Sequence, residues 1–238
     1  MNLAIDIGNT AVKWACFEGG EEVEQGQWGG RGAVPKELTE AMERAERTLG
    51  CASGDVTCLG REIPTLSAKS PIPLRLDYRT PETLGADRIA TACGAWALHP
   101  GEACVVVDAG TCITVDFVDG AGVYHGGAIM PGLKMKLKAL HTFTDKLPLI
   151  EIDGLQRAPV LGRSTEECIV AGTLGATMLA VAGYVALYRA KTAGLHVLLT
   201  GGDAPRLTTG GADGWEQVPH LTLAGLDVAM RYAAEKGA

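Results

Sequence analysis

The stretch Leu3-Ala4-Ile5-Asp6-Ile7-Gly8-Asn9-Thr10 decides how this chain folds, because its pattern recurs as Cys104-Val105-Val106-Val107-Asp108-Ala109-Gly110-Thr111. Each copy is a short apolar run, which predicts a buried strand, followed by an Asp, a Gly and a hydroxyl residue. A second strand is expected after each copy, over Ala11 to Phe17 and over Ile113 to Val118, and each ends in a turn. Each copy therefore predicts a β-hairpin with an acidic loop.

The two loops have the chemistry of a phosphate site. Glycine lets the backbone turn sharply and approach a ligand, while backbone N–H groups and a Thr hydroxyl can donate to phosphate oxygens. An Asp can hold magnesium or another cation, directly or through water. Two such loops facing each other would form a cleft that holds a nucleoside triphosphate from both sides. Asp-Gly-Thr is also ordinary turn chemistry, but its repetition in matching strand contexts favours the binding interpretation.

The repeat predicts two similar halves in tandem, residues 1–100 and 101–238, with a boundary near Pro100-Gly101. Other elements are expected from periodicity and from capping residues. They are a helix over Pro35 to Leu49, strands near Val56 to Leu59 and Leu74 to Leu76, a helix that opens at Thr83 and ends at Leu98, and a helix over Leu133 to Leu140. Gly126 to Gly132 predicts a glycine-rich turn, which either closes on a ligand or only connects a strand to a helix.

Composition narrows the class of protein. A net charge of −7 argues against nonspecific nucleic-acid binding, which needs clustered Lys and Arg. The seven cysteines are scattered and lack a Cys-x-x-Cys pair, and the five histidines lack ligand spacing, so neither a disulfide framework nor a zinc site is expected. No basic region precedes the first strand, so we expect no signal peptide and a cytoplasmic protein.

One segment is long enough to span a bilayer. Cys168 to Tyr188 carries no charge, but it is rich in Gly, Ala and Thr rather than in Leu and Ile. It also follows Ser164-Thr165-Glu166-Glu167, a helix capping box. We expect a buried central helix or a subunit interface here, and no membrane span.

Asp87-Arg88 is the candidate catalytic pair. A carboxylate at a helix N-terminus can accept a proton from a hydroxyl, while the guanidinium beside it binds an anionic group of the substrate. Alternatively, Asp87 caps its own helix and Arg88 lies on the surface. Together with two phosphate-type loops and a glycine-rich loop, the pair points to phosphoryl transfer.

These segments resemble the ordered motifs of the type III pantothenate kinases. The motifs are Asp6 to Lys13, Gly85 to Arg88, Asp108 to Thr111 and Gly126 to Gly132, and the resemblance continues through Thr142 to Pro148, Gly162 to Gly172 and Thr200 to Gly202. It implies an α/β fold of duplicated ribonuclease-H-like halves, as in actin, sugar kinases and Hsp70, usually as a homodimer. It also implies ATP-dependent phosphorylation of pantothenate to 4'-phosphopantothenate, the first step towards coenzyme A, with Mg²⁺ and a monovalent cation, K⁺ or NH4⁺.

The resemblance also assigns site residues. It places the nucleotide loop on Asp6, Ile7, Gly8, Asn9, Thr10, Ala11, Val12 and Lys13, and the substrate-binding run on Gly85, Ala86, Asp87 and Arg88. Asp87 is the proton acceptor, Asp108 the ligand of the monovalent cation and Thr111 an ATP contact, while Tyr78 and Thr165 contact pantothenate. We expect Asp6 to hold magnesium through water, and Lys13 either neutralises charge during transfer or is a surface residue.

One departure and two alternatives remain open. Ile113 stands where the family often has a Thr, which removes a hydroxyl from the second loop. Another small-molecule kinase of the same fold, acting on a sugar or polyol, would share most of these motifs. A non-catalytic relative that serves as an accessory factor in transcription is the second alternative; the acidic charge and the presence of both Asp87 and Asp108 speak against it.

Overall fold

The structure, a computed structural model, describes residues 1–54, 56–151, 157–207 and 214–237. The chain divides into two compact units, which are described separately here. Unit 1 comprises residues 1–102, 117–126 and 220–238, and unit 2 comprises residues 103–116 and 127–219. The tandem halves expected from the sequence, residues 1–100 and 101–238, follow chain order and stay a prediction.

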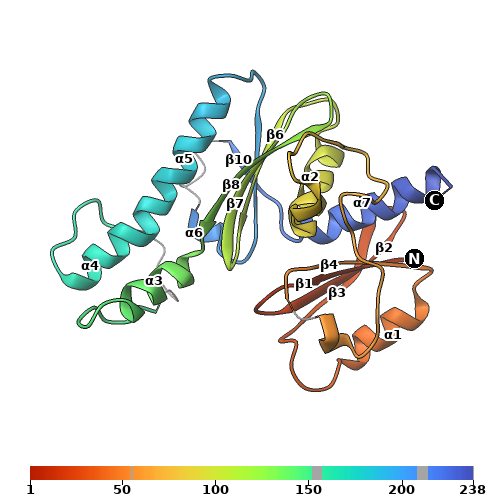
Figure 1. Cartoon of the computed structure of the whole chain (residues 1–238), viewed down its shortest axis with the longest axis horizontal. Coiled ribbons are helices and arrows are strands. Elements are labelled where there is room, and N and C mark those ends of the chain that lie inside the picture. The colour runs from red at the N-terminus through yellow and green to blue at the C-terminus, as the bar shows by residue number, and fades with distance from the viewer. Residues whose placement is uncertain (55, 152–156, 208–213, 238) are drawn as a thin grey trace. The chain divides into compact units, whose positions relative to one another are not determined.

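A four-stranded sheet is the centre of unit 1 (Figure 1). Its strand order is β3-β2-β1-β4, and the strands run over Asn2–Ile7 (β1), Val12–Glu18 (β2), Glu21–Trp28 (β3) and Arg47–Ala52 (β4). The central strand β1 pairs antiparallel with β2 and parallel with β4. The predicted first hairpin is therefore confirmed, and it lies at the middle of a mixed sheet.

The second sheet repeats this strand order. It runs β10-β9-β6-β7-β8-β5, so β8-β7-β6-β9 corresponds to β3-β2-β1-β4. Its strands are Arg75–Leu76 (β5), Cys104–Ala109 (β6), Cys112–Val118 (β7), Val123–Pro131 (β8), His196–Thr200 (β9) and Trp215–Gln217 (β10). The parallel pair β6 with β9 matches the pairing of β1 with β4, while β5, parallel to β8, and β10, parallel to β9, extend the second sheet at its two edges. This confirms the predicted fold class, a duplicated α/β arrangement of mixed sheets with flanking helices.

Strand alternation gives the two faces of the first sheet different partners. Leu3, Ile5 and Ile7 pack with the buried residues of α1 (Lys36–Arg44). Ala4 and its neighbours on the opposite face pack with α2 (Ala86–Leu98) and α7 (Leu221–Glu235). Because Asp6 alternates in phase with Ala4, its side chain lies on the α2 side of the sheet.

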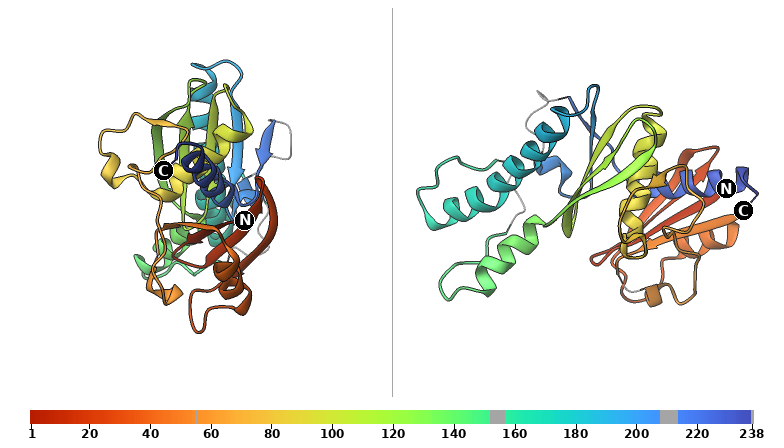
Figure 2. Two further views of the ribbon diagram at one scale, coloured as in Figure 1. Left: turned by 90° about the vertical axis from the view of Figure 1, so that its right-hand side faces the viewer. Right: turned by 45° about the horizontal axis from the view of Figure 1, so that its top comes forward.

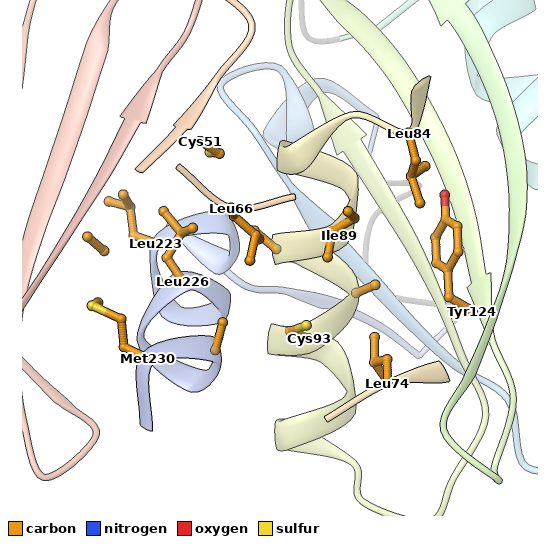
Figure 3. Packing of buried hydrophobic residues seen from close by; sticks show 14 of the residues in the cluster. Cys51, Leu66, Leu74, Leu84, Ile89, Cys93, Tyr124, Leu223, Leu226 and Met230 are labelled. Atoms are coloured by element: carbon orange, nitrogen blue, oxygen red, sulfur yellow. The ribbon is translucent and has the colours of Figure 1, made fainter. Parts of the chain in front are cut away.

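Helices α2 and α7 form the main core of unit 1 (Figure 3). Ile89 and Cys93 of α2 belong to one buried cluster with Leu223, Leu226 and Met230 of α7, and Leu66 lies between the two helices. The backbones approach closely at Gly225, where an added Cβ would lie 1.7 Å from the carbonyl oxygen of Ala90. Only a residue without a side chain permits this crossing.

Gly225→Ala is therefore expected to destabilise the protein by about 3 kcal/mol, because the neighbour at Gly225 is backbone and cannot move aside. Gly29→Ala is the matched control, since an added Cβ there would meet nothing within 4 Å. The control should change the free energy of unfolding by less than about 0.5 kcal/mol. Urea denaturation of both variants measures the difference, and equal midpoints would contradict the close crossing.

Three local predictions were wrong. The predicted helix over Pro35 to Leu49 ends at Arg44, because Arg47–Ala52 pairs with β1 as a strand and this pairing overrides its helical periodicity. Val56–Leu59 forms a 3-10 helix, not a strand. The segment predicted as a glycine-rich turn is instead the end of β8. An added Cβ on Gly127 would lie 1.8 Å from the carbonyl oxygen of Val115, so glycine here allows close contact between strands.

The other local predictions agree with the structure. A strand lies at Arg75–Leu76, α2 ends at Leu98, and α3 covers Leu133–Thr142. Two short elements complete the described chain, a 3-10 turn over Pro81–Thr83 and α6 over Ala204–Leu207.

The uncharged segment forms a long helix in unit 2 (Figure 2). It consists of α4 (Thr165–Val170), a π-helical turn (Ala171–Gly175) and α5 (Ala176–Arg189). By length and composition alone this helix could cross a membrane, and the core helix of a soluble protein can have the same length and composition. Thr177 is fully buried within unit 2 and accepts a hydrogen bond from Lys136 Nζ of α3 at 2.6 Å.

Candidate functional site

Asp6 lies between two cross-strand neighbours in unit 1. The register of the sheet places it opposite Lys13 on β2 and opposite Cys51 on β4. The Cys51 Sγ donates a hydrogen bond to Asp6 Oδ1 at 3.4 Å. Burial raises the pKa of Asp6, the Cys51 hydrogen bond and the Lys13 charge oppose that shift, and the charge of Asp87 adds to it. The two carboxylates of the predicted site are therefore close enough to interact.

The turn that follows β4, at Ser53 and Gly54, supports the predicted nucleotide loop. Gly8 N–H donates to the Ala11 carbonyl at 3.0 Å and closes the turn, which leaves Asn9 and Thr10 exposed at its tip. Both Ser53 and Gly54 donate their N–H groups to the Ile7 carbonyl, at 3.0 and 2.9 Å. An added Cβ on Gly54 would lie 2.4 Å from the Gly8 oxygen. Sequence reasoning missed Cys51 and Gly54, since only the parallel pairing of β4 with β1 brings them here.

Asp87 lies in the first turn of α2, with Gly85 at the N-cap position. The Asp87 Oδ1 accepts a hydrogen bond from the Arg88 N–H at 2.8 Å, and an added Cβ on Gly85 would lie 2.5 Å from that oxygen. The carboxylate is half-buried. Asp87 thus bonds to its own helix, as the alternative interpretation of the sequence expected. The same interpretation placed Arg88 on the surface, and this was wrong, because Arg88 is only 6% exposed.

The Arg88 guanidinium lies against two neighbouring tyrosine rings. Its central carbon is 5.9 Å from the centroid of the Tyr78 ring and 6.0 Å from that of Tyr124. The two rings are 6.1 Å apart and tilted by 49°. A guanidinium held against aromatic faces keeps a fixed position. Tyr78 was a sequence candidate, whereas the fully buried Tyr124 was missed because it belongs to a strand with no motif at that position.

In unit 2 the Asp108 carboxylate lies beside a glycine loop. Asp108 follows the buried part of β6 and is paired with Thr200 of β9. Gly201 has a φ of +90°, and an added Cβ there would lie 2.5 Å from Asp108 Oδ1 and 2.4 Å from the Ala109 oxygen. The Asp203 N–H donates to the same Ala109 oxygen at 2.9 Å. The Thr200-Gly201-Gly202 motif therefore packs directly against the second acidic loop.

Thr111 is exposed at the tip of this second loop. The Gly110 N–H donates to the Cys112 carbonyl at 2.9 Å, and the Gly132 N–H, at the start of α3, donates to the Thr111 carbonyl at 3.0 Å. Ile113, which departs from the family pattern, is fully buried. Its side chain belongs to the core, so this departure removes no exposed group from the loop.

Thr165 is the first residue of α4 and is exposed. Ser164 at the N-cap accepts a hydrogen bond from the Glu167 N–H at 3.1 Å, which confirms the predicted helix start. Thr165 lies in unit 2 with Asp108 and Thr111, whereas all other sequence candidates lie in unit 1. They are Asp6, Ile7, Gly8, Asn9, Thr10, Ala11, Val12, Lys13, Tyr78, Gly85, Ala86, Asp87 and Arg88.

The donor sets of the two units suit different ligands. Unit 1 offers the carboxylates of Asp6 and Asp87, the guanidinium of Arg88 and the backbone amides of an exposed turn. Such groups suit an anion that carries a metal ion, next to a substrate with a hydroxyl group. Unit 2 places a carboxylate next to a backbone carbonyl, and such oxygens are ligands for hard cations. Magnesium at Asp6 and a monovalent cation at Asp108 therefore both fit the residues present.

Comparisons with known sequences give one consistent result. A profile of the family described as type III pantothenate kinase matches residues 57–187. The type III pantothenate kinase of Phocaeicola vulgatus is 40% identical over 213 residues, which cover 85% of this chain and 86% of that protein. The type III pantothenate kinase of Cytophaga hutchinsonii is 33% identical over 239 residues, which cover 98% and 99%.

Solved structures give the same fold. A Campylobacter jejuni protein described as a Baf family transcriptional activator has a TM-score of 0.65 at 18% identity and covers 98% of this chain and 99% of that chain. The activator of 2-hydroxyisocaproyl-CoA dehydratase from Clostridium difficile, solved with bound ADPNP, has a TM-score of 0.58 at 16% identity, covering 99% and 96%. A ROK hexokinase from Thermus thermophilus has a TM-score of 0.52 at 14% identity, covering 99% of each chain. At these identities the likeness concerns the fold, which is that of the actin-like ATPases and sugar kinases.

Proposed function

The chain belongs to the type III pantothenate kinase family, and from this premise we propose how its residues phosphorylate pantothenate. The reaction transfers a phosphoryl group from ATP to pantothenate and gives 4'-phosphopantothenate, the first step of coenzyme A biosynthesis. The observation that carries the assignment to this chain is that Asp6 lies on the face of the sheet that α2 covers, and that α2 begins with Asp87 and the Arg88 guanidinium, which is held against two tyrosine rings.

We assign nucleotide binding to the loop from Asp6 to Lys13. The exposed tip, Asn9 and Thr10, offers amide and hydroxyl donors to the triphosphate. Asp6 would hold Mg²⁺ through water, and such an ion would supply neutralisation of the charge on the phosphate oxygens. Lys13, the cross-strand partner of Asp6 on β2, adds a positive charge on the same face of the sheet. Asp6 and Lys13 thereby share the face of the sheet that is covered by α2, the helix that carries Asp87.

We assign the substrate side to the start of α2. Asp87 accepts the proton of the terminal hydroxyl of pantothenate as that oxygen attacks the γ-phosphorus. Arg88, with Gly85 and Ala86, orients pantothenate, and Tyr78 contacts it beside the guanidinium. Because phosphoryl transfer is usually loose, positioning and charge neutralisation contribute more than base strength.

In unit 2 we propose that Asp108 binds K⁺ or NH4⁺, that Thr111 contacts ATP and that Thr165 contacts pantothenate. The support for Asp108 is its place beside the Ala109 carbonyl and Gly201. Asp108→Asn should abolish activation by potassium and lower the rate at saturating potassium by about a hundredfold. Asp145→Asn, an exposed Asp of the same unit, is the control. A potassium titration of initial rates measures both, and full potassium activation of Asp108→Asn would remove Asp108 from this role.

We further propose a homodimer through α5. Gly172, Ala176, Leu179, Gly183 and Leu187 follow helical spacing and are all exposed, with Leu179 at 76% and Leu187 at 63%. An uncharged stripe of this kind fits a second copy of the same surface in a symmetric interface.

Leu179→Glu is expected to convert the dimer to a monomer, because it places a charge at the centre of the stripe. Sedimentation equilibrium at micromolar concentration measures the mass, with Glu166→Gln as a surface control on α4. A wild-type monomer under these conditions would contradict the proposed interface.

We also place the protein in the cytoplasm, where the thiols of its seven cysteines persist.

A substrate panel tests the function. Purified protein with ATP, magnesium and potassium should consume ATP with pantothenate and not with sugars or polyols. Turnover of a sugar in place of pantothenate would instead support the alternative kinase of the same fold.

A further inference from the structure

His125 on β8 bridges two carboxylates in unit 1, in a cluster outside the residues assigned above. Its Nε2 lies 2.7 Å from Asp119 Oδ2, and its Nδ1 lies 3.3 Å from Asp77 Oδ2. The imidazole also stacks on Phe117, with ring centroids 5.7 Å apart and planes 25° apart. Three contacts from two segments therefore fix a side chain that is 35% exposed.

Asp119 is a rigid anchor for this bridge. Its Oδ1 accepts hydrogen bonds from the N–H groups of Ala121 and Val123 at 2.9 and 3.0 Å, in the turn between β7 and β8. Burial raises the pKa of Asp119, but the hydrogen bonds from His125 and these amides outweigh burial and leave the pKa lowered. The carboxylate therefore stays ionised and faces His125.

The other end of the bridge adjoins Tyr78. Asp77 directly precedes Tyr78 in the chain, and its N–H donates to the Tyr124 carbonyl at 2.9 Å. On the β8 side, Gly126 directly follows His125 and has a φ of +85°. An added Cβ on Gly126 would lie 3.0 Å from Tyr78 Cε2. The segments on both sides of the Tyr78 ring are thus tied together through His125.

We propose that His125 is a positioning residue of the pantothenate site: by bridging Asp77 and Asp119, it holds the Tyr78 ring against Arg88. The inference rests on the proposed role of Tyr78 as a pantothenate contact. The charged groups that face His125 are Asp77, after β5, and Asp119, in the β7–β8 turn. Both ring nitrogens donate only in the imidazolium form, and the neutral ring keeps one of the two bonds. The two contacts together tie Asp77, and with it Tyr78, to Asp119.

The test compares His125→Ala and His125→Gln with wild type in steady-state kinetics. Both variants should raise KM for pantothenate about tenfold and leave kcat and KM for ATP within about twofold, because one or two charge-assisted hydrogen bonds are lost away from the reacting atoms. His196→Gln is the matched control: it breaks a histidine contact to Glu216 at 3.4 Å in unit 2. It should leave all three constants unchanged.

The split between KM for pantothenate and kcat separates positioning from a purely structural role, because a loss of folded structure would impair binding of both substrates and turnover together. Calorimetric titration of pantothenate into the ADP-bound variants should show a loss of affinity that matches the rise in KM.

If both His125 variants keep the wild-type KM for pantothenate, the role of His125 is overturned and the proposed function stands. The same holds if kcat, KM for pantothenate and KM for ATP all worsen to the same extent. Absence of pantothenate turnover by wild type would overturn the proposed function and this inference with it.

Discussion

Asp87→Asn should lower kcat by about a thousandfold and leave the affinity for ATP within about twofold, because the variant removes a proton acceptor and keeps the local structure. An Asn Oδ1 still accepts the hydrogen bond that Asp87 Oδ1 receives from the Arg88 N–H at 2.8 Å. The start of α2 and the burial of Arg88 are therefore preserved. Single-turnover rates and calorimetric titration of ATP measure the two quantities separately.

Glu82→Gln is the matched control for this experiment. Glu82 is an exposed carboxylate in the short 3-10 turn before α2, so its loss removes a nearby charge without touching the proposed site. It should keep the wild-type rate. Near-normal turnover by Asp87→Asn would remove Asp87 from the role of proton acceptor and leave catalysis to positioning and charge.

Arg88→Met is expected to raise KM for pantothenate by about a hundredfold, equivalent to about 3 kcal/mol, because an ionic hydrogen-bond donor is lost from a buried position. The methionine keeps much of the side-chain volume that packs against Tyr78 and Tyr124, so the core of unit 1 should stay folded. Arg88→Lys keeps the charge but not the planar donor, and it should lie between Arg88→Met and wild type.

Steady-state kinetics measure KM for pantothenate in these variants, and thermal melting measures their stability. Arg75→Lys, at an exposed arginine of β5, is the control for an Arg-to-Lys substitution itself. A large rise in KM without a large fall in melting temperature supports a contact with substrate. If both Arg88 variants bind pantothenate as wild type does, the buried guanidinium is structural only.

The fold was predictable from the sequence because its signals are local. Apolar runs that end in Asp and Gly marked β1 and β6, and in both cases the hairpin followed within a few residues. Strand alternation could then place Asp6 and Lys13 on one face. The predicted helix over Pro35 to Leu49 was partly wrong because β4 is defined by its pairing with β1, a contact that periodicity cannot see.

The missed residues of the site share this cause. Cys51 and Gly54 reach Asp6 and Gly8 through the parallel pairing of β4 with β1. The pairing of β8 with β5 brings Tyr124 close to Tyr78, and both rings lie against Arg88. His125 joins segments that are 48 and 6 residues away in the chain, at Asp77 and Asp119. No short motif encodes such contacts, so they appear only when the sheets are assembled.

The most direct test of the central claim is identification of the product. Wild-type protein incubated with ATP, magnesium, potassium and pantothenate should form phosphopantothenate, detected by mass spectrometry together with an equal amount of ADP, and Asp87→Asn should form almost none. ADP without phosphopantothenate, or no reaction in either protein, would contradict the account.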